Sequence, residues 1–291
     1  MNFAIGDVRI DSVTDLEVME FPLATMLPHA ENLDGFGDWL EPDHYHRASN
    51  TLLLVCQSII LRAPGRVILI DTCVGCGKQR PARPAWHERD DAGRYLAGLA
   101  ALGLAPEQVD TVFCTHLHVD HVGWNTRRED GRWVPTFPRA RYLFGRRELA
   151  YWNERVAALG AAAVNHGAHQ DSVVPILEAG LADLVDDGHE VAPGVVLTPL
   201  PGHTPGQMGL AVERPTGRAL FCGDAIHSPV QIVRPDWSTA FCVDQAAAAR
   251  TRMGILEAAA AHGQIVVPAH FRGSGRVRIE RDGTGFRPVF Q

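Results

Sequence analysis

The residues best suited to chemistry are crowded into one short segment, Thr115-His116-Leu117-His118-Val119-Asp120-His121. Imidazole and carboxylate groups are the ligands that suit zinc and its neighbours. The first two histidines are two residues apart, so they can point the same way from an extended segment. Asp120 and His121 follow where the chain must turn at Gly123, so they can reach a second point nearby. This spacing predicts that one loop serves two metal ions, against the alternative of a histidine-rich surface loop.

Further candidate ligands stand at the ends of other predicted strands: His203 in a Pro-Gly-His-Thr-Pro-Gly turn, Asp224 after Leu220-Phe221-Cys222-Gly223, and His270 after an apolar run from residue 265. Each follows a β-type run and then Gly or Pro. Taken singly, His203 reads as a solvated turn residue and Asp224 as a helix cap or turn residue. Together with the first loop they give five His and two Asp at strand ends, which predicts a metal site.

This set of residues resembles that of the metallo-β-lactamase-fold hydrolases. The family pattern is His-x-His-x-Asp-His, then a Gly-His-Thr-Pro-Gly turn, a Gly-Asp and a late His, and all occur in order between about Asn50 and His270. The resemblance implies that the first metal is held by His116, His118 and His203, the second by Asp120, His121 and His270, and that Asp224 bridges them. It also implies that Asp71 orients ligands instead of binding metal.

The fold implied by the resemblance is α/β, an αβ/βα four-layer sandwich, and we expect one domain over residues 1–291. The local patterns agree with it. Strands are predicted at 3–15 (a hairpin), 50–62, 67–71, 111–114, 195–198, 207–212, 218–222, 265–267, 277–281 and 286–290. Helices are predicted at 92–102 and in an Ala-rich stretch that Asp244 caps and that ends near His262.

A long insert, about residues 124–184, separates the metal loop from the His203 turn. Helices are predicted at 146–159 and 173–184, joined by a loop that contains His166 and His169. Connections of this length are usually functional, so we expect a helical lid over the metals. Trp124, Trp133 and Trp152 either line an apolar pocket there or belong to the ordinary core.

The branch of the family is indicated by the residues around Asp224. True β-lactamases of this fold generally lack an Asp at the bridging position, which argues against antibiotic hydrolysis. The stretch from Cys222 to Gln231 resembles the methyl parathion hydrolase and lactonase branch. Acyl-homoserine lactonases use a Tyr shortly after the third His, and no Tyr follows Tyr151. This departure favours the methyl-parathion-hydrolase-like group.

We therefore expect a dinuclear hydrolase with two divalent ions, Zn²⁺ first and Mn, Fe or Co as alternatives. A bridging hydroxide would attack a lactone, an ester or a phosphotriester. Asp120 or a metal-bound water would pass a proton to the leaving group. His227 would contact the substrate or donate that proton, and a structural role is its alternative. Two further hypotheses remain: a hydrolytic dehalogenase of an aromatic substrate, and a non-enzymatic metal-binding sensor.

The composition bounds the partners. A net charge of −7 and the lack of a basic cluster exclude nucleic acid as the expected substrate, which leaves a small molecule. The N-terminus shows no signal peptide pattern and no stretch of 18 apolar residues occurs, so we expect a cytoplasmic protein with reduced thiols and no membrane span. Cys73 and Cys76 form a C-x-x-C that could be a redox pair or half a zinc site. The resemblance suggests a homodimer.

Overall fold

The computed structural model describes residues 1–291, with the exception of the side chain of Ala92. The chain folds into two compact units. One, called here the insert-bearing unit, comprises Asn2–Asp15 and Gln57–Asp186. The other, the C-terminal unit, comprises Met1, Leu16–Cys56 and Asp187–Gln291. The long strands β2 (Val8–Pro22) and β4 (Thr51–Ala63) each contribute residues to both units.

The insert-bearing unit is built on a mixed sheet in which β4, β5, β6, β9 and β10 are neighbours in that order. The bounds of its further strands are β1 (Asn2–Ile5), β5 (Arg66–Ile70), β6 (Thr111–Phe113), β9 (Arg141–Gly145) and β10 (Ala182–Val185). From β5 to β10 the strands pair in parallel, and Ile70 of β5 lies opposite Phe113 of β6. The segments that follow β5 and β6 therefore leave the sheet at the same edge. Ligand sites in sheets of this type form outside the carboxyl ends of the strands.

Helices α2 (Ala92–Ala101), α3 (Arg146–Leu159) and α4 (Val174–Glu178) belong to the same unit, together with a two-stranded hairpin of β7 (Thr126–Glu129) and β8 (Arg132–Pro135). Helix α3 starts directly after β9 and packs against it. The predicted helix at 146–159 is confirmed. The predicted helix at 173–184 is wrong in its second half. Gly180 adopts a left-handed φ of 68°, which ends the helix, and β10 then pairs with β9.

The C-terminal unit holds a seven-stranded sheet, β11 to β17 in chain order. Its strands are β11 (Glu190–Ala192), β12 (Val195–Pro199), β13 (Met208–Arg214), β14 (Gly217–Gly223), β15 (Ile265–Pro268), β16 (Val277–Asp282) and β17 (Gly285–Phe290). The pairing is antiparallel except between β14 and β15. The unit also contains the short elements α1 (Leu23–Met26), β3 (Tyr45–His46) and α5 (Val230–Val233).

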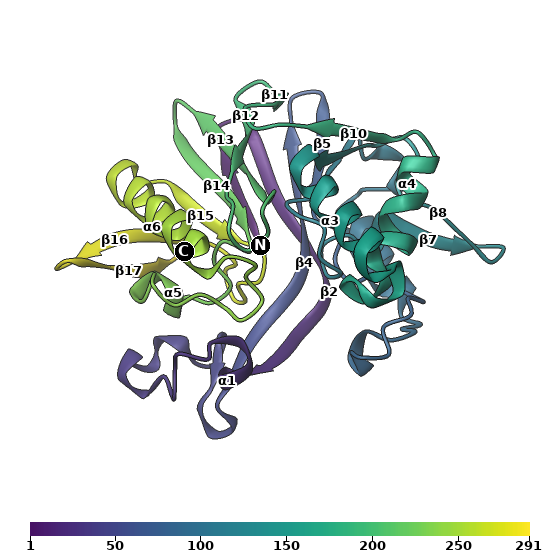
Figure 1. Ribbon diagram of the computed structural model, residues 1–291. Helices are drawn as coiled ribbons and strands as arrows, with labels where there is room; N and C mark the ends of the chain where they lie inside the picture. The colour runs from purple at the N-terminus through teal and green to yellow at the C-terminus, as the bar shows by residue number, and fades with distance from the viewer. The chain divides into compact units, whose positions relative to one another are not determined.

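Helix α6 (Gln245–His262) packs against β16 of this sheet (Figure 1). Its ends follow the prediction from sequence. The Asp244 carboxylate accepts a hydrogen bond of 2.8 Å from Ala247 N, and Gly263 ends the helix with a φ of 62°. Ile255, Leu256 and Ala259 turn inward and join the core of the sheet. The helix thereby fixes where the loops before it can lie.

The predicted strand ranges are confirmed to within a few residues, except that the second strand of the first hairpin ends at Pro22 and not at Asp15. The helix predicted at 92–102 is also confirmed. Cys114 and Cys222 are both buried in the core. Among the residues that the structure describes, no helix has the length and apolar character needed to cross a membrane. The single domain and the lid remain predictions.

Candidate metal centre

The metal loop predicted at residues 115–121 begins directly after β6 in the insert-bearing unit. Asp71, which follows β5, controls its shape. The Asp71 carboxylate accepts hydrogen bonds from Thr115 N at 2.8 Å, from the Thr115 hydroxyl at 2.9 Å and from His121 Nδ1 at 2.8 Å. Asp71 has a left-handed φ of 56°, a strained conformation for a residue other than glycine. It orients the loop, as the resemblance implied.

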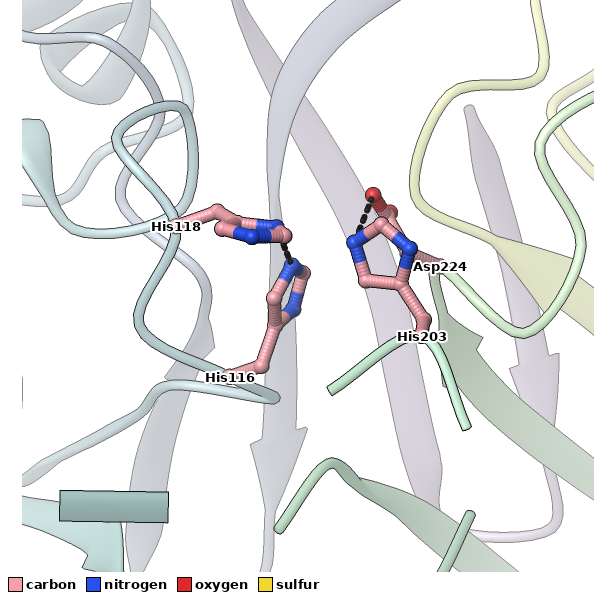
Figure 2. A group of neighbouring side chains, drawn as sticks. All are labelled: His116, His118, His203 and Asp224. Carbon is pink, nitrogen blue, oxygen red and sulfur yellow. Dashed lines mark hydrogen bonds and ion pairs between the residues drawn. The ribbon is translucent and has the colours of Figure 1, made fainter. Parts of the chain in front are cut away.

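The hydrogen bonds of the loop determine which imidazole nitrogens can bind a cation. Since Thr115 donates its hydroxyl proton to Asp71, its oxygen accepts from His116 Nδ1 at 3.1 Å. This leaves the lone pair of His116 on Nε2, which lies 2.9 Å from Nδ1 of His118 (Figure 2). The two nitrogens face each other across a shared proton in this geometry, and a cation can take the place of that proton.

Asp120 and His121 offer a second pair of ligand atoms. His121 Nδ1 is directed to Asp71, so its Nε2 carries the lone pair, and this atom lies 4.0 Å from Asp120 Oδ1. His121 is buried, while 16% of the Asp120 side chain is exposed. The loop therefore presents two separate pairs of donors, and their use by two metal ions remains a prediction.

The C-terminal unit brings three histidines around one carboxylate. Asp224 Oδ2 lies 3.3 Å from His203 Nε2 and 3.1 Å from His227 Nε2, and Asp224 Oδ1 lies 3.1 Å from His270 Nε2. Figure 2 shows His203 turned toward Asp224. All four side chains are at least nine-tenths buried. Three imidazoles that converge on a buried carboxylate form a donor set typical of a metal site.

In two of these imidazoles, those of His270 and His203, the opposite nitrogen contacts a protein group. His270 Nδ1 donates to the Val55 carbonyl at 2.8 Å, and His203 Nδ1 lies 3.7 Å from the Cys242 thiol. Both rings therefore direct Nε2 at Asp224. Metal-binding histidines characteristically donate their second N–H to a protein acceptor, which fixes ring orientation and tautomer.

The strand register explains why these residues meet. Gly223 at the end of β14 lies opposite Pro268 of the parallel strand β15, so Asp224 and His270 leave the sheet at the same edge. The His203 turn joins β12 to β13 at that edge, because Pro199 pairs with Met208. Residues 243 and 244 donate backbone hydrogen bonds to the carbonyls of His203 and Gly202 and fix the turn against the start of α6.

His227 is positioned through the backbone. Gln231 Oε1 accepts from His227 N at 2.7 Å, and Gln231 Nε2 donates to the Trp237 carbonyl. Burial lowers the pKa of His227, and the neighbouring Asp224 carboxylate opposes that shift. A neutral imidazole beside the carboxylate can donate a hydrogen bond from either nitrogen, so His227 suits contact with substrate as well as a structural role.

Each unit thus gathers its own share of the predicted ligands: His116, His118, Asp120 and His121 in one, and His203, Asp224 and His270 in the other. Buried imidazole and carboxylate donors fit zinc and related divalent ions. Sequence reasoning missed three residues that bind the candidate ligand segments: Glu148 and Asn165 bind Leu117, and Cys242 contacts His203. The signal for Asn165 is a turn pattern, Asn-His-Gly, in which Asn and Gly tolerate left-handed backbone.

The tryptophans of the insert have different roles. Trp124 is core, stacked on Tyr95 with ring centroids 4.9 Å apart. Trp152 is buried and lies edge-on to His118 at 5.3 Å. Trp133 covers the ammonium group of Lys78 at 3.7 Å. Each of the three tryptophans therefore has a different partner within the fold.

Known proteins support this description of the chain. Residues 52–270 match the family described as the Metallo-beta-lactamase superfamily. A probable metallo-hydrolase of Mycobacterium tuberculosis is 26% identical over 189 residues, covering 60% of this chain and 58% of that protein. An N-acyl homoserine lactonase of a Bacillus species is 28% identical over 139 residues, 46% of each chain. The chain therefore spans only about half the length of these relatives.

Solved structures resemble the whole chain. The hydrolase AbOPH of the beta lactamase superfamily has a TM-score of 0.79 at 22% identity and covers 99% of this chain and 96% of its own. AidC, a dizinc quorum-quenching lactonase with a bound product, has a TM-score of 0.78 at 20% identity, covering 100% and 97%. At this identity the likeness concerns the fold, and it confirms the predicted α/β class. From the family match over residues 52–270, the chain belongs to the metallo-β-lactamase superfamily.

Proposed function

We propose that this protein is a dinuclear metal-dependent hydrolase that opens lactones or cleaves esters, with phosphotriesters as further substrates. The observation that carries the proposal is the arrangement around Asp224, where three buried imidazoles direct Nε2 at one carboxylate. A carboxylate with both oxygens engaged in this way suits a bridging ligand. The relatives named above, a probable metallo-hydrolase and a lactonase, support a hydrolytic reaction.

The proposed ligand sets follow the superfamily pattern. His116, His118 and His203 would hold one ion, Asp120, His121 and His270 the other, and Asp224 would bridge. Zn²⁺ is the proposed metal, with Mn, Fe or Co as alternatives, because the donors are imidazole nitrogens and carboxylate oxygens. When bound, divalent ions acidify water and polarise a carbonyl or phosphoryl oxygen.

The residues of the chain do the remaining work. Asp71 and Thr115 fix the rings of His121 and His116, so that their Nε2 atoms keep one direction throughout the reaction. Asp120 is the more accessible carboxylate, so it is the proposed group that passes a proton to the leaving group. His227, whose neutral ring lies beside Asp224, is proposed to hydrogen-bond the substrate.

The substrate is proposed to be a small molecule, and nucleic acid is not proposed because the net charge is −7. Methyl-parathion-hydrolase-like activity, a cytoplasmic location and a homodimer also remain proposals. A panel of lactones, aryl esters, phosphotriesters and β-lactams, assayed with the zinc-loaded protein, ranks the substrate classes. An aryl halide belongs in the panel, since its turnover alone would favour a hydrolytic dehalogenase. Metal binding with no turnover of any compound would favour the sensor.

The ligand assignment is tested with Asp224→Ala. We expect this variant to lose bound metal, measured by elemental analysis, together with turnover, because the proposed bridge is removed. Asp236→Ala is the matched control, since Asp236 is an exposed carboxylate paired with Arg234 in the same loop region. An Asp224→Ala protein that retains two ions and the full rate would show that the bridging assignment is wrong.

A further inference from the structure

The peptide groups on both sides of His118 are bound by a single side chain of the insert. Asn165 Nδ2 donates to the Leu117 carbonyl at 2.6 Å, and Asn165 Oδ1 accepts from Val119 N at 3.0 Å. The carboxamide thus binds the metal loop as the edge of a neighbouring strand would, with one donor and one acceptor. His118 is the residue between the two bound groups, so its Cα position follows that of Asn165.

Asn165 is itself held rigidly. Its φ of 50° is left-handed, a conformation that Asn adopts more readily than most residues, and the φ of His166 is 52°. The carbonyl of His166 accepts a hydrogen bond of 3.0 Å from Arg80, whose guanidinium is completely buried. Arg80 also binds both carboxylate oxygens of Asp171, at 2.7 and 2.8 Å. The turn that carries Asn165 is therefore anchored to the loop that follows β5.

A second residue of the insert binds the same loop from α3. The buried Glu148 accepts a hydrogen bond of 3.1 Å from Leu117 N and one of 2.6 Å from Trp152 Nε1. The Trp152 ring lies edge-on to the imidazole of His118, with centroids 5.3 Å apart. Leu117 thus has its N–H and its carbonyl bound by two different elements of the insert, and Trp152 limits the rotation of the His118 ring.

We propose that Asn165 and Glu148 are positioning residues that hold His118 in the orientation for metal binding, so that the insert sets the affinity of one of the two ions. The inference rests on the proposed function, because it needs His118 to be a ligand. Residues that orient a ligand from behind typically change metal affinity 10- to 100-fold when they are replaced. The insert then acts as a brace for the metal loop.

The variant Asn165→Asp tests the brace with little change in shape. An Asp side chain keeps the acceptor for Val119 N and tolerates the left-handed φ, but it presents an oxygen where the Leu117 carbonyl needs a donor. Glu148→Gln is the second variant, which removes the charge and keeps the size. The matched control is Asn153→Ala. Asn153 lies in the same insert and accepts from His169 Nε2 at 2.8 Å, without binding the metal loop.

The measurement is a Co²⁺ titration followed by visible absorbance, with zinc affinity determined by chelator competition. For Asn165→Asp we expect one of two ions to bind roughly 10- to 100-fold more weakly, with an altered Co²⁺ spectrum. Glu148→Gln should shift the same ion less, and Asn153→Ala should leave both unchanged. If Asn165→Asp and Glu148→Gln both showed wild-type metal affinities and spectra, this inference would be overturned and the proposed function would not. Failure of the wild-type protein to bind any divalent metal would overturn the proposed function, and the inference with it.

Discussion

Replacing Asp171 by Asn should destabilise the protein strongly, because this carboxylate neutralises two completely buried cations. Arg80 donates two hydrogen bonds to it at 2.7 and 2.8 Å, and the Lys78 ammonium lies 3.5 Å away. Neither cation has any exposed side-chain surface, while 13% of the Asp171 side chain is exposed. The substitution keeps the size of the side chain and removes only the charge and part of the acceptor capacity.

The two cations respond differently to the loss. Burial lowers the pKa of Lys78 to about 7, so Lys78 can release its proton and remain buried as an amine. The guanidinium of Arg80 cannot do so, because arginine stays charged in proteins. Removing one partner of a buried ion pair typically costs about 3–5 kcal/mol. Arg80 therefore accounts for most of the expected loss, which corresponds to a fall in Tm on the order of 10 °C.

Urea unfolding and calorimetry measure this loss. The matched control is Asp186→Asn, because Asp186 pairs with Arg146 at 3.2 Å in the same unit, with both side chains more than half exposed. Exposed pairs contribute roughly 0–1 kcal/mol, so the control should unfold almost like the wild type. Equal stability of the Asp171→Asn and Asp186→Asn proteins would refute the argument that the buried cluster depends on its carboxylate.

Two further variants examine the same physical reasoning elsewhere. Lys78→Met should reveal the pH dependence that Lys78 confers. The folded pKa of about 7 lies below the ordinary lysine pKa of 10.5. Between these pH values the unfolded state binds more protons, so the stability contributed by this group rises with pH. Between pH 7 and pH 9 the free energy of unfolding of the wild type, measured in urea, should rise by about 2 kcal/mol relative to that of Lys78→Met. A difference that stays constant with pH would contradict this. Gly202→Ala should cost roughly 3 kcal/mol or more and weaken zinc binding, since φ is +134° and a Cβ would lie 2.2 Å from Ala248 N, behind the turn that carries His203. Gly254→Ala in α6, where a Cβ meets nothing within 4 Å, should instead stabilise by about 1 kcal/mol, and a similar effect of both substitutions would exclude steric contact as the cause.

The sequence predicted the strands well because the local signals agreed with the final environment. Strand β4 consists of two apolar runs separated by Gln57 and Ser58, and it is buried along almost its whole length, so the pattern favoured a buried strand. The start of α6 was equally clear, because Asp244 caps it and no competing pattern precedes it. Residues 182–184 fall in the predicted helix because a short apolar run does not distinguish the helical period from the strand period. Their pairing with β9 depends on a strand about forty residues earlier, which no local window contains.

The candidate ligands could be found from sequence for a different reason: their chemistry is specific even without structure. The His and Asp residues and their spacing indicate which ligand atoms are available. The predicted strand ends indicate where in the fold these atoms lie. The orienting residues give no such signal. Cys242 lies 39 residues from His203 and Asn165 lies 48 from Leu117, and neither residue type is rare in loops. Only the folded chain shows that Cys242 contacts His203 and that Asn165 binds Leu117.

The insert illustrates where this difference matters most. Its length suggested a lid, which is a statement about access to substrate. The contacts of Asn165 and Glu148 with Leu117 and Val119 indicate in addition a mechanical role toward the metal loop. The two roles make different demands on the insert. A lid must move, whereas a brace must keep ring positions fixed to a fraction of an ångström. The buried Arg80–Asp171 pair anchors the bracing turn, so any motion that admits substrate should occur in other parts of the insert. Amide hydrogen exchange should therefore be slower at residues 165–171 than at the exposed end of α3. Faster exchange at residues 165–171 would show that the turn carrying Asn165 is itself the part that moves.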